Sequence, residues 1–252
     1  MNLFDSHAHY NDEKFSKDRE KIIQETFEKG VSNFIISGYN FESSKKAIEI
    51  ANNYENAYAI IGISPNDIQD SNKVNGIEEL AKKSKKVVGI GEIGLDYYWN
   101  KENKEIQKQL FIKQIKLANK LNKPIIIHTR DAVYDTLEIL KENTVKKRGI
   151  FHCCPLNREL IKEALKLGYY ISFSGNITFK NAKSEECVKL VPIDKILIET
   201  DSPYLSPEPF RGKRNDSRKV KLVAQKVADI KGLELEEVAK TTYDNAKRIF
   251  NI

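Results

Sequence analysis

The stretch LFDSHAHYND, residues 3–12, distinguishes between two folds that this chain could adopt, a closed barrel and a doubly wound open sheet. Its apolar start is followed by two histidines, and alternation along an extended chain would point His7 and His9 the same way, within reach of one metal ion. An isolated pair is equally typical of two unrelated histidines in a polar segment. A doubly wound open sheet usually carries a glycine-rich phosphate loop after its first strand, and SHAH occupies that place here. The stretch therefore favours a closed barrel.

Short apolar runs rich in β-branched residues recur along the rest of the chain. Counting the first, eight of them predict strands at 3–4, 33–37, 58–63, 87–90, 124–127, 149–151, 169–173 and 196–198. Apolar residues at three- and four-residue steps predict helices that include 18–29, 42–53, 104–121, 132–142, 217–231 and 234–250. Asp131 and Asn157 stand where they could cap helix starts.

The alternation of strands and helices predicts the fold class. Strands alternating with helices form parallel sheets, and continuous apolar strands suit a sheet buried on both faces. Eight such units in 252 residues match the (β/α)8, or TIM, barrel, an α/β fold. Because no Pro/Gly/Ser-rich linker interrupts the chain, residues 1–252 are expected to form a single domain.

The composition is that of an ordinary enzyme, with a net charge of +6. No apolar run approaches the roughly 18 residues needed to cross a membrane, and no secretory signal is visible, so a cytoplasmic location is expected. The three cysteines, Cys153, Cys154 and Cys187, contain no C-x-x-C and exclude a disulfide framework. The lysine clusters are typical of solvated helix ends. The sequence indicates neither a protein partner nor an oligomeric state.

The residues able to carry chemistry follow the predicted strands. Barrel enzymes place their sites at the C-terminal ends of the strands, and all four histidines stand at such ends. One acidic residue joins them after the fourth strand and another after the eighth. The predicted metal ligands are His7, His9, Glu92, His128, His152 and Asp201.

This mixture of imidazoles and carboxylates suits divalent metals such as Zn, Mn, Fe or Co. Six ligands exceed what one tetrahedral zinc takes, but they suit two ions about 3.5–4 Å apart with a bridging carboxylate. His7, His9 and Asp201 are expected to hold one ion, because the first and eighth strands become neighbours when the barrel closes. His128 and His152 are expected to hold the other, with the carboxylate after the fourth strand as the bridge.

Three further residues near these strand ends are not expected to be ligands. Cys153 and Cys154 could ligate zinc, but adjacent residues point to opposite faces of a strand. Glu199 precedes Asp201 by two positions and is expected to be a hydrogen-bonded group behind a ligand, or a surface charge.

The chain resembles the TatD-type metal-dependent deoxyribonucleases, a branch of the amidohydrolase-like barrels. The motifs that carry the resemblance span nearly the whole chain: FDSHAHYND at 4–12, VVGIGEIGLDYYW at 87–99, KPIIIHTRDA at 123–132, FHC at 151–153, YYISFSGNITFKNA at 169–182, ILIETDSPYLSP at 196–207 and RGKRND at 211–216. The six metal-binding positions of the family match the predicted ligands one for one. The resemblance implies a barrel enzyme that hydrolyses phosphodiester bonds in DNA, often as an exonuclease on single strands, with two divalent ions (Mg, Mn or Zn).

The chain departs from the family pattern at the rim of the expected site. The stretch GISPN at 62–66 places Ser64 and Asn66 where the family usually has histidines. HCCPL at 152–156 replaces the usual H-C-F-S-G, and Ser217 replaces a proline. None of these changes removes a predicted ligand, so they bear on substrate handling rather than on metal binding.

The expected mechanism is hydrolysis by a water molecule that two metal ions activate. Asp201, a ligand with a free oxygen, is the candidate base. Arg130 follows a predicted strand end, where its cation could reach a phosphate. Arg211, Lys213 and Arg214 form a loop beyond the eighth strand, near where barrels commonly bind phosphate, although such a loop could also be a solvated turn.

Two questions stay open from the sequence. Tyr97, Tyr98 and Trp99 could stack bases of a single strand, or they could pack together at the top of the barrel. The same metal pair could also serve an amide or ester hydrolase such as a D-aminoacyl-tRNA deacylase, and a non-catalytic binding barrel is a further alternative. The cations at the rim favour a phosphodiester, with single-stranded DNA as the expected substrate.

Overall fold

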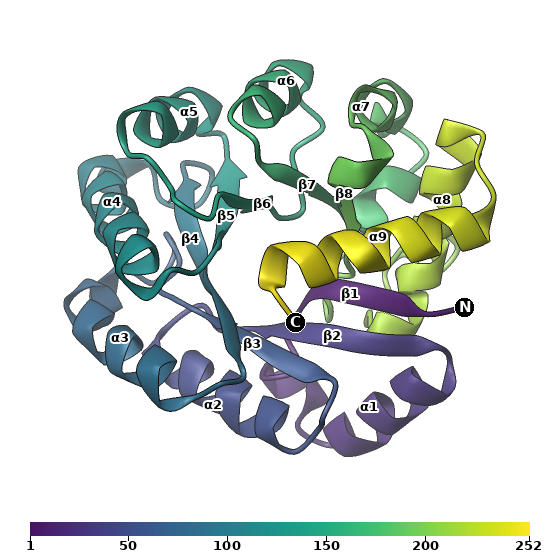
Figure 1. Ribbon diagram of the computed structural model, residues 1–252, viewed down its shortest axis with the longest axis horizontal. Coiled ribbons are helices and arrows are strands. Elements are labelled where there is room, and N and C mark those ends of the chain that lie inside the picture. Colours follow the sequence, from purple (N-terminus) through teal and green to yellow (C-terminus); the bar gives the residue numbers. More distant parts are fainter.

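The computed structural model describes residues 1–252 and contains one parallel sheet, in which each strand pairs with the next along the chain (Figure 1). The strands are β1 (Leu3–Ala8), β2 (Val31–Ser37), β3 (Ala57–Ile61), β4 (Val87–Asp96), β5 (Ile125–Arg130), β6 (Gly149–Phe151), β7 (Tyr170–Phe173) and β8 (Ile196–Ile198). All eight predicted strands are present, and the predicted (β/α)8 barrel is confirmed.

Nine α-helices accompany the strands. They are α1 (Arg19–Glu28), α2 (Phe41–Asn52), α3 (Val74–Lys83), α4 (Lys104–Leu121), α5 (Val133–Glu142), α6 (Arg158–Lys166), α7 (Ser184–Leu190), α8 (Val220–Lys231) and α9 (Leu235–Phe250). Asn157 caps α6 by accepting a hydrogen bond from the Leu160 N–H, as predicted. Asp131 does not cap α5: its φ is +53°, and Ala132 is the residue before the helix. No helix is both long enough and apolar enough to cross a bilayer.

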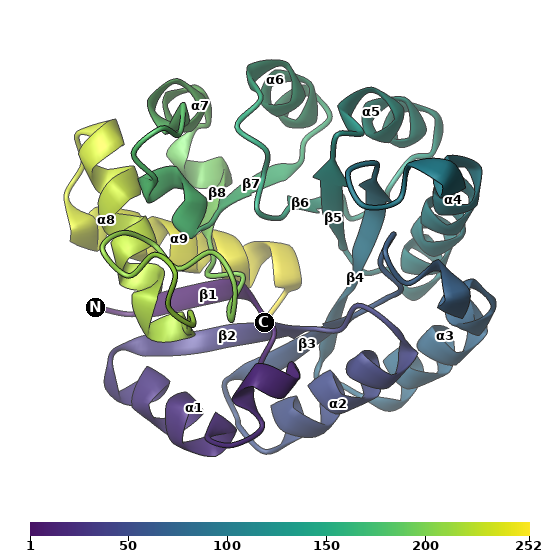
Figure 2. The same cartoon turned by 180° about the vertical axis from the view of Figure 1, so that it is seen from behind.

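The barrel is closed by residues just beyond the short strand β8. The Asp201 N–H donates to the His7 carbonyl at 2.9 Å, and the His9 N–H donates to the Ser202 carbonyl at 2.7 Å. Figure 2, which views the molecule from the side opposite to Figure 1, shows that the segment after β8 forms a long loop on this side of the barrel before α8 begins. The closing hydrogen bonds thus involve the same residues that the sequence singles out for chemistry.

The interior of the barrel is apolar at its N-terminal end. One side chain from each strand contributes to this layer: Phe4, Ile35, Ile60, Val88, Ile126, Ile150, Tyr170 and Leu197. Ala246 and Phe250 of α9 join the same cluster, and the Phe250 ring stacks on Phe4 with centroids 6.3 Å apart. Figure 1 shows α9 lying across this end in front of β1. Helix α9 therefore covers the bottom of the barrel.

Two residues further along six of these strands, the same face becomes polar. The side chains at these positions are Ser6, Ser37, His128, His152, Ser172 and Glu199. Ser6 and Ser172 meet across the interior, with their hydroxyl oxygens 3.1 Å apart. The barrel therefore has an apolar floor and a polar upper half that opens at the C-terminal ends of its strands, referred to below as the mouth.

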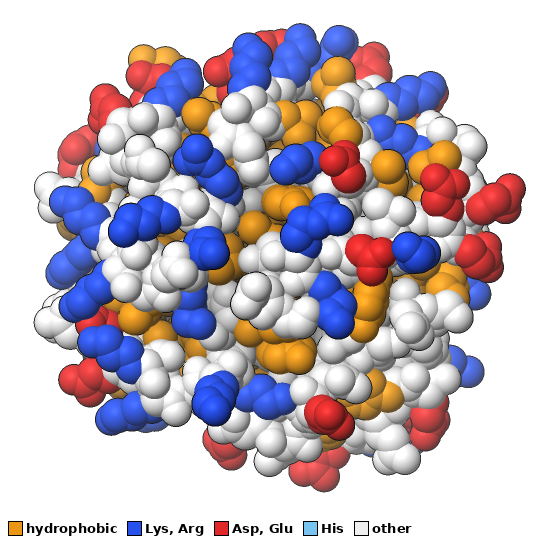
Figure 3. All heavy atoms as spheres, viewed as in Figure 1, with side chains coloured by type: hydrophobic (Ala, Val, Ile, Leu, Met, Phe, Trp, Pro, Cys, Tyr) orange, Lys and Arg blue, Asp and Glu red, His pale blue; other side chains and the backbone are white.

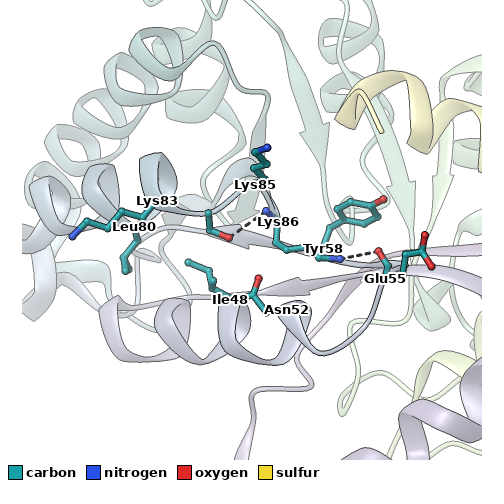
Figure 4. A pocket seen from close by; sticks show the side chains of 9 residues that line it. Ile48, Asn52, Glu55, Tyr58, Leu80, Lys83, Lys85 and Lys86 are labelled. Carbon is teal, nitrogen blue, oxygen red and sulfur yellow. Dashed lines mark hydrogen bonds between the residues drawn. The ribbon is translucent and has the colours of Figure 1, made fainter.

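Lysine and arginine side chains gather over the face that surrounds α9 (Figure 3). A hollow at this end is lined by residues that include Lys85, Lys123 and Arg248. Another, between α2, α3 and the start of β4, is shown in Figure 4. One lysine of each hollow stabilises the fold: Lys86 donates to the carbonyls of Tyr54, Glu55 and Ala57, and Lys123 donates to that of Val87. Neither hollow is lined by a histidine.

Candidate metal centre

The first group of predicted ligands converges at the mouth, where β1 meets the segment after β8. The Nε2 atoms of His7 and His9 lie 3.2 Å apart. Oδ1 of Asp201 lies 3.2 Å from Nε2 of His9 and 3.8 Å from Nε2 of His7. Three potential donor atoms from two segments far apart in the sequence thus face a common point.

Glu92 lies between this group and the remaining two histidines. Its Oε1 is 2.9 Å from Nδ1 of His128 and 3.3 Å from Nε2 of His152. Its Oε2 is 3.6 Å from Nε2 of His7 and 3.9 Å from Nε2 of His9. The two oxygens of one carboxylate therefore face two different sets of imidazoles, which is the arrangement that a bridging carboxylate requires.

Irregular strand pairing shapes both halves of the cluster. The register of β1 against β2 shifts between Asp5 and Ala8, and that of β4 against β5 shifts between Ile90 and Ile93. Such irregularities re-aim side chains and are common next to active sites. His7 lies within the first shift, and its ring stacks on that of His152 with centroids 4.0 Å apart. Simple alternation along β1 was therefore an incomplete reason for the convergence of the first two histidines.

Carbonyl and carboxylate oxygens hold the outer nitrogens of three imidazoles. Nε2 of His128 donates to Oδ2 of Asp96 at 2.9 Å, and Nδ1 of His9 donates to the Ser37 carbonyl at 3.1 Å. Nδ1 of His152 lies 3.4 Å from Oε1 of Glu199, which also accepts the Cys153 N–H. Because one ring nitrogen of each imidazole is hydrogen-bonded on the outer side, the other ring nitrogen faces the centre of the site.

Sequence reasoning anticipated the place of Glu199 but missed Asp96. Asp96 could have been found from its spacing: it lies four residues after Glu92 in one extended segment, and residues an even number of positions apart in a strand point to the same face. Because β4 extends to Asp96 instead of ending at residue 90, both carboxylates belong to the strand itself. The expected strand end was therefore too early by six residues, counted from 90 to 96.

The ionisable groups of the cluster perturb one another. Burial disfavours the charged form of His128, but hydrogen bonds with Asp96 and Glu92 outweigh it and raise its pKa to about 9. Burial likewise opposes the charge of Glu92, yet the surrounding imidazoles hold the pKa of this carboxyl well below its usual range. The pKa of His7 is lowered by burial and by the charge of His152. A cation bound here therefore competes with protons for imidazole nitrogens.

Asp201 combines an engaged oxygen with a free one. Its Oδ1 faces His9, whereas Oδ2 has no hydrogen-bond partner within the protein. Burial would raise the pKa of Asp201, but the hydrogen bond with His9 and the neighbouring imidazole charges outweigh it and lower the pKa. The carboxylate is thus ionised at neutral pH and has an oxygen left for a further partner.

A cavity of about 720 Å³ lies over the cluster at the mouth. Its lining includes Arg130, Trp99, and the residues Ser64 and Asn66, which stand where the family usually has histidines. At those positions, Asn66 donates to Oδ2 of Asp96 at 3.3 Å, and the Ser64 hydroxyl donates to Asp67 at 2.8 Å. These two departures therefore lie in the wall of the site, whereas Ser217 does not line the cavity.

The predicted cationic loop borders an adjoining hollow of about 450 Å³, which shares Tyr204 and Leu205 with the main cavity. Arg211 and Lys213 line this hollow and form no ion pair. Arg214 also lines it, but its guanidinium pairs with both oxygens of Asp18, at 2.9 and 2.6 Å. Arg211 and Lys213 are therefore available to bind an anion, whereas the ion pair of Arg214 with Asp18 anchors the loop.

The aromatic run after β4 is divided between the core and the surface. Tyr97 is buried, and its hydroxyl donates to Asp135 at 2.6 Å, so it does not present a free ring to a ligand. Tyr98 and Trp99 are exposed. The Arg130 guanidinium lies 3.8 Å from the centroid of the Tyr98 ring.

The donor set fits a divalent cation. Two triads each bring their donor atoms within 4.8 Å of one another: His7, His9 and Asp201 form one, and His7, Glu92 and His152 form the other. Imidazole nitrogen and carboxylate oxygen are ligands that zinc, manganese and iron accept. Neither triad contains a cysteine: Sγ of Cys153 lies 3.1 Å from the Ser174 hydroxyl instead. His7 belongs to both triads, so the division between the two groups is less strict than the sequence indicated.

Comparison with known proteins gives a consistent result. The family model of TatD-related DNases matches residues 4–251. The metal-dependent hydrolase YabD of Bacillus subtilis is 45% identical over 99% of both chains, and the 3′–5′ ssDNA/RNA exonuclease TatD of Shigella flexneri is 32% identical over 99% of both. The crystal structure of YJJV, a TatD homologue from Escherichia coli, superposes with a TM-score of 0.94 at 26% identity, covering 99% of this chain and 98% of that one. The chain therefore belongs to the TatD family and is a metal-dependent hydrolase.

Proposed function

We propose that this hydrolase cleaves phosphodiester bonds in single-stranded DNA and removes nucleotides from an end of the strand. The observation that carries the proposal is the position of the carboxylate–imidazole cluster in a cavity with unpaired cations at its rim. The similarity to a 3′–5′ exonuclease along nearly the whole chain supports the same activity.

The residues of the cluster would hold two divalent ions, zinc, magnesium or manganese. His7, His9 and Asp201 would bind one, and His128 with His152 the other. The carboxylate between them has one oxygen directed to each set and would bridge. Such ions, when bound, polarise a phosphoryl oxygen and lower the pKa of water.

Asp201 is the proposed general base. It is ionised at neutral pH, and its free Oδ2 is available to accept a proton from the attacking water. Its backbone N–H donates to the His7 carbonyl, which fixes the carboxylate at the closure of the barrel. The base is therefore held by the same hydrogen bond that joins the ends of the sheet.

The cations at the rim favour a phosphodiester over a carbonyl substrate. Arg130 lies at one wall of the cavity, and Arg211 and Lys213 line the hollow that adjoins the other. A nucleic-acid strand carries one negative charge per nucleotide, whereas a small neutral ester or amide has no comparable use for these side chains. Aminoacyl-tRNA carries the same backbone charges, so it is distinguished by the activity assay below and not by these cations. Contacts from the three cations would draw the strand across the cluster and leave the scissile phosphate above it.

The proposal is tested with a single-stranded DNA labelled at one end, incubated with Mg²⁺ or Mn²⁺. A ladder of successively shorter products is expected, and a chelator should abolish it.

Asp201→Asn should keep its circular dichroism spectrum and lose about a hundredfold or more in kcat. Asp131→Asn is the matched control, because Asp131 is exposed and shares the positive φ of 53° but lies outside the cavity lining. Turnover of D-aminoacyl-tRNA without any DNA cleavage would overturn the nuclease assignment in favour of the ester hydrolase.

A further inference from the structure

The exposed aromatic side chains of this protein all belong to segments at the mouth. They follow β4, β5 or β8, and they are Tyr98, Trp99, Tyr134, Tyr204 and Phe210. Elsewhere on the surface the large exposed hydrophobic side chains are aliphatic, Met1 and Ile106. The most exposed aromatic rings of the protein therefore lie around the opening of the site.

Trp99 is the aromatic residue with the most informative position. Its side chain is 69% exposed, although it belongs to a turn that packs Tyr97 into the core. Its ring meets Tyr98 edge to face, with centroids 4.8 Å apart, and it lines the same cavity as the metal centre. Tyr97 therefore provides the aromatic packing at the top of the barrel, and this packing does not explain why the Trp99 indole is exposed to solvent.

Arg130 completes this group of side chains. Its guanidinium stacks on Tyr98 at 3.8 Å and lies 5.5 Å from the Trp99 ring centroid. No carboxylate pairs with it, in contrast to Arg214 and Arg218 on the other side of the barrel. An unpaired cation beside an exposed indole presents one partner for a phosphate and one for a flat ring.

Asp96 fixes the distance between this group and the metal centre. Its Oδ1 accepts the backbone N–H groups of Tyr98 and Trp99, both at 3.0 Å, and its Oδ2 accepts Nε2–H of His128 at 2.9 Å. The turn that carries the indole is therefore tied to a proposed metal ligand through a single carboxylate. The rings are presented at a set position relative to the site of hydrolysis.

We propose that Tyr98, Trp99 and Arg130 form an aromatic platform that stacks the base of a nucleotide next to the scissile phosphodiester, while Arg130 contacts a phosphate of the same strand. Stacking on aromatic rings accepts every base, and it requires bases that are not paired in a duplex. The platform therefore selects single-stranded nucleic acid. This inference rests on the proposed function and names the element that confers its preference for single strands.

The test uses Trp99 as its own probe, because it is the only tryptophan in the chain. The metal-free protein in a chelator is titrated with oligothymidylate and, separately, with an abasic deoxyribose-phosphate strand of equal length. Stacking predicts that the thymidylate strand quenches Trp99 fluorescence and binds more tightly, whereas the abasic strand leaves the emission nearly unchanged. Unchanged emission with bound thymidylate would contradict a base on the indole.

Variants then separate stacking from charge, with affinities measured by anisotropy of labelled strands. Trp99→Ala should weaken thymidylate binding about tenfold and leave abasic binding almost unaltered, and Trp99→Phe should retain most of the affinity. Tyr134→Ala is the matched control, because Tyr134 is 74% exposed at the mouth but does not line the cavity. Its affinity for both strands should stay within about twofold of the wild type.

The outcomes distinguish the platform from the nuclease activity. If the wild type cleaves DNA but Trp99→Ala binds both strands as the wild type does, the platform is wrong and the nuclease assignment stands. An equal loss for both strands also overturns base stacking, because it indicates a contact with the backbone. If the wild type neither binds nor cleaves single strands, the proposed function fails and the platform fails with it.

Discussion

Asp96 links two parts of the site through the two oxygens of one side chain. One oxygen accepts Nε2–H of His128, which turns Nδ1 toward Glu92, and the other accepts two backbone N–H groups of the aromatic turn. A carboxylate behind an imidazole ligand fixes its orientation and raises its basicity. The residue thus positions a proposed ligand without reaching the cations itself.

Replacing Asp96 by Asn should weaken metal binding more than it disturbs the fold. The amide oxygen can still accept the turn N–H groups, but the amide nitrogen would face the Nε2–H of His128, and two donors cannot pair. We expect about a 10- to 100-fold loss in affinity for Mn²⁺ or Zn²⁺, measured by titration calorimetry. Asp135→Asn changes a carboxylate that accepts from Tyr97 and should leave that affinity intact. Equal affinities in Asp96→Asn and the wild type would contradict the positioning role.

At the level of single residues, the sequence predicted the members of the cluster better than their surroundings. Histidine is rare in this chain, so four imidazoles after three predicted strands were a strong signal. Asp96 was missed because aspartate is common, and only the true length of β4 shows that it shares a strand with Glu92. The pairing of Arg214 with Asp18 joins residues 196 positions apart, and no local pattern indicates it.

Irregular pairing within β1 and β4 directs His7 and Glu92 into the site. The strands themselves were predictable, because buried parallel strands read as continuous apolar runs. The irregularities were not predictable, since they depend on the neighbouring strand and not on the residues of the strand alone. Helices α3 and α7 were not predicted, and of α6 only the cap at Asn157 was; all three are short, at seven to ten residues.

Asp216 caps the short 3-10 turn Ser217–Lys219 that leads into α8; it is buried and accepts hydrogen bonds from Arg218 and Lys219. Burial would raise the pKa of Asp216, but these two cations outweigh it and hold the pKa below its ordinary value of 3.8. A carboxyl group with a lowered folded-state pKa stabilises the protein above its unfolded-state pKa, and this contribution is lost as the pH falls through the folded-state value.

Asp216→Asn should therefore destabilise the protein by about 2 kcal/mol at neutral pH, because it removes a buried charge partner. The difference from the wild type should shrink progressively below about pH 4. Urea unfolding of both proteins at a series of pH values measures it. A difference that stays constant from neutral to strongly acidic pH would show that the charge of Asp216 contributes nothing to stability.

The two ends of the barrel have different roles: one end contributes mainly to stability, and the other carries the residues for chemistry. The N-terminal half holds an apolar layer that α9 covers, and the mouth holds the cluster and the cavity. The barrel as a whole followed from the count and spacing of the strands, whereas the role of α9 as a cover did not. The sequence predicted a helix at 234–250, but its pattern of apolar residues does not indicate that this helix covers the end of the barrel.

Phe250→Ala should destabilise the protein without altering its chemistry. Phe250 is 3% exposed and fills the floor of the barrel against Phe4, so its removal leaves a cavity that costs about 3 kcal/mol. Urea unfolding measures the loss, and Ile106→Ala, a truncation on the exposed side of α4, should cost less than about 0.5 kcal/mol. Activity per folded molecule should match the wild type. A selective loss of kcat in the folded variant would show that the floor and the mouth are coupled.

The proposed function depends on side chains of β1, β4 and β5, and of the segments just after β1, β6 and β8, holding two divalent cations at the mouth. The most direct measurement is an anomalous difference map from crystals grown with Mn²⁺. We expect two peaks on either side of the Glu92 carboxylate, one among His7, His9 and Asp201 and the other beside His128 and His152. Bound manganese found elsewhere, with no peak among these side chains, would contradict the claim.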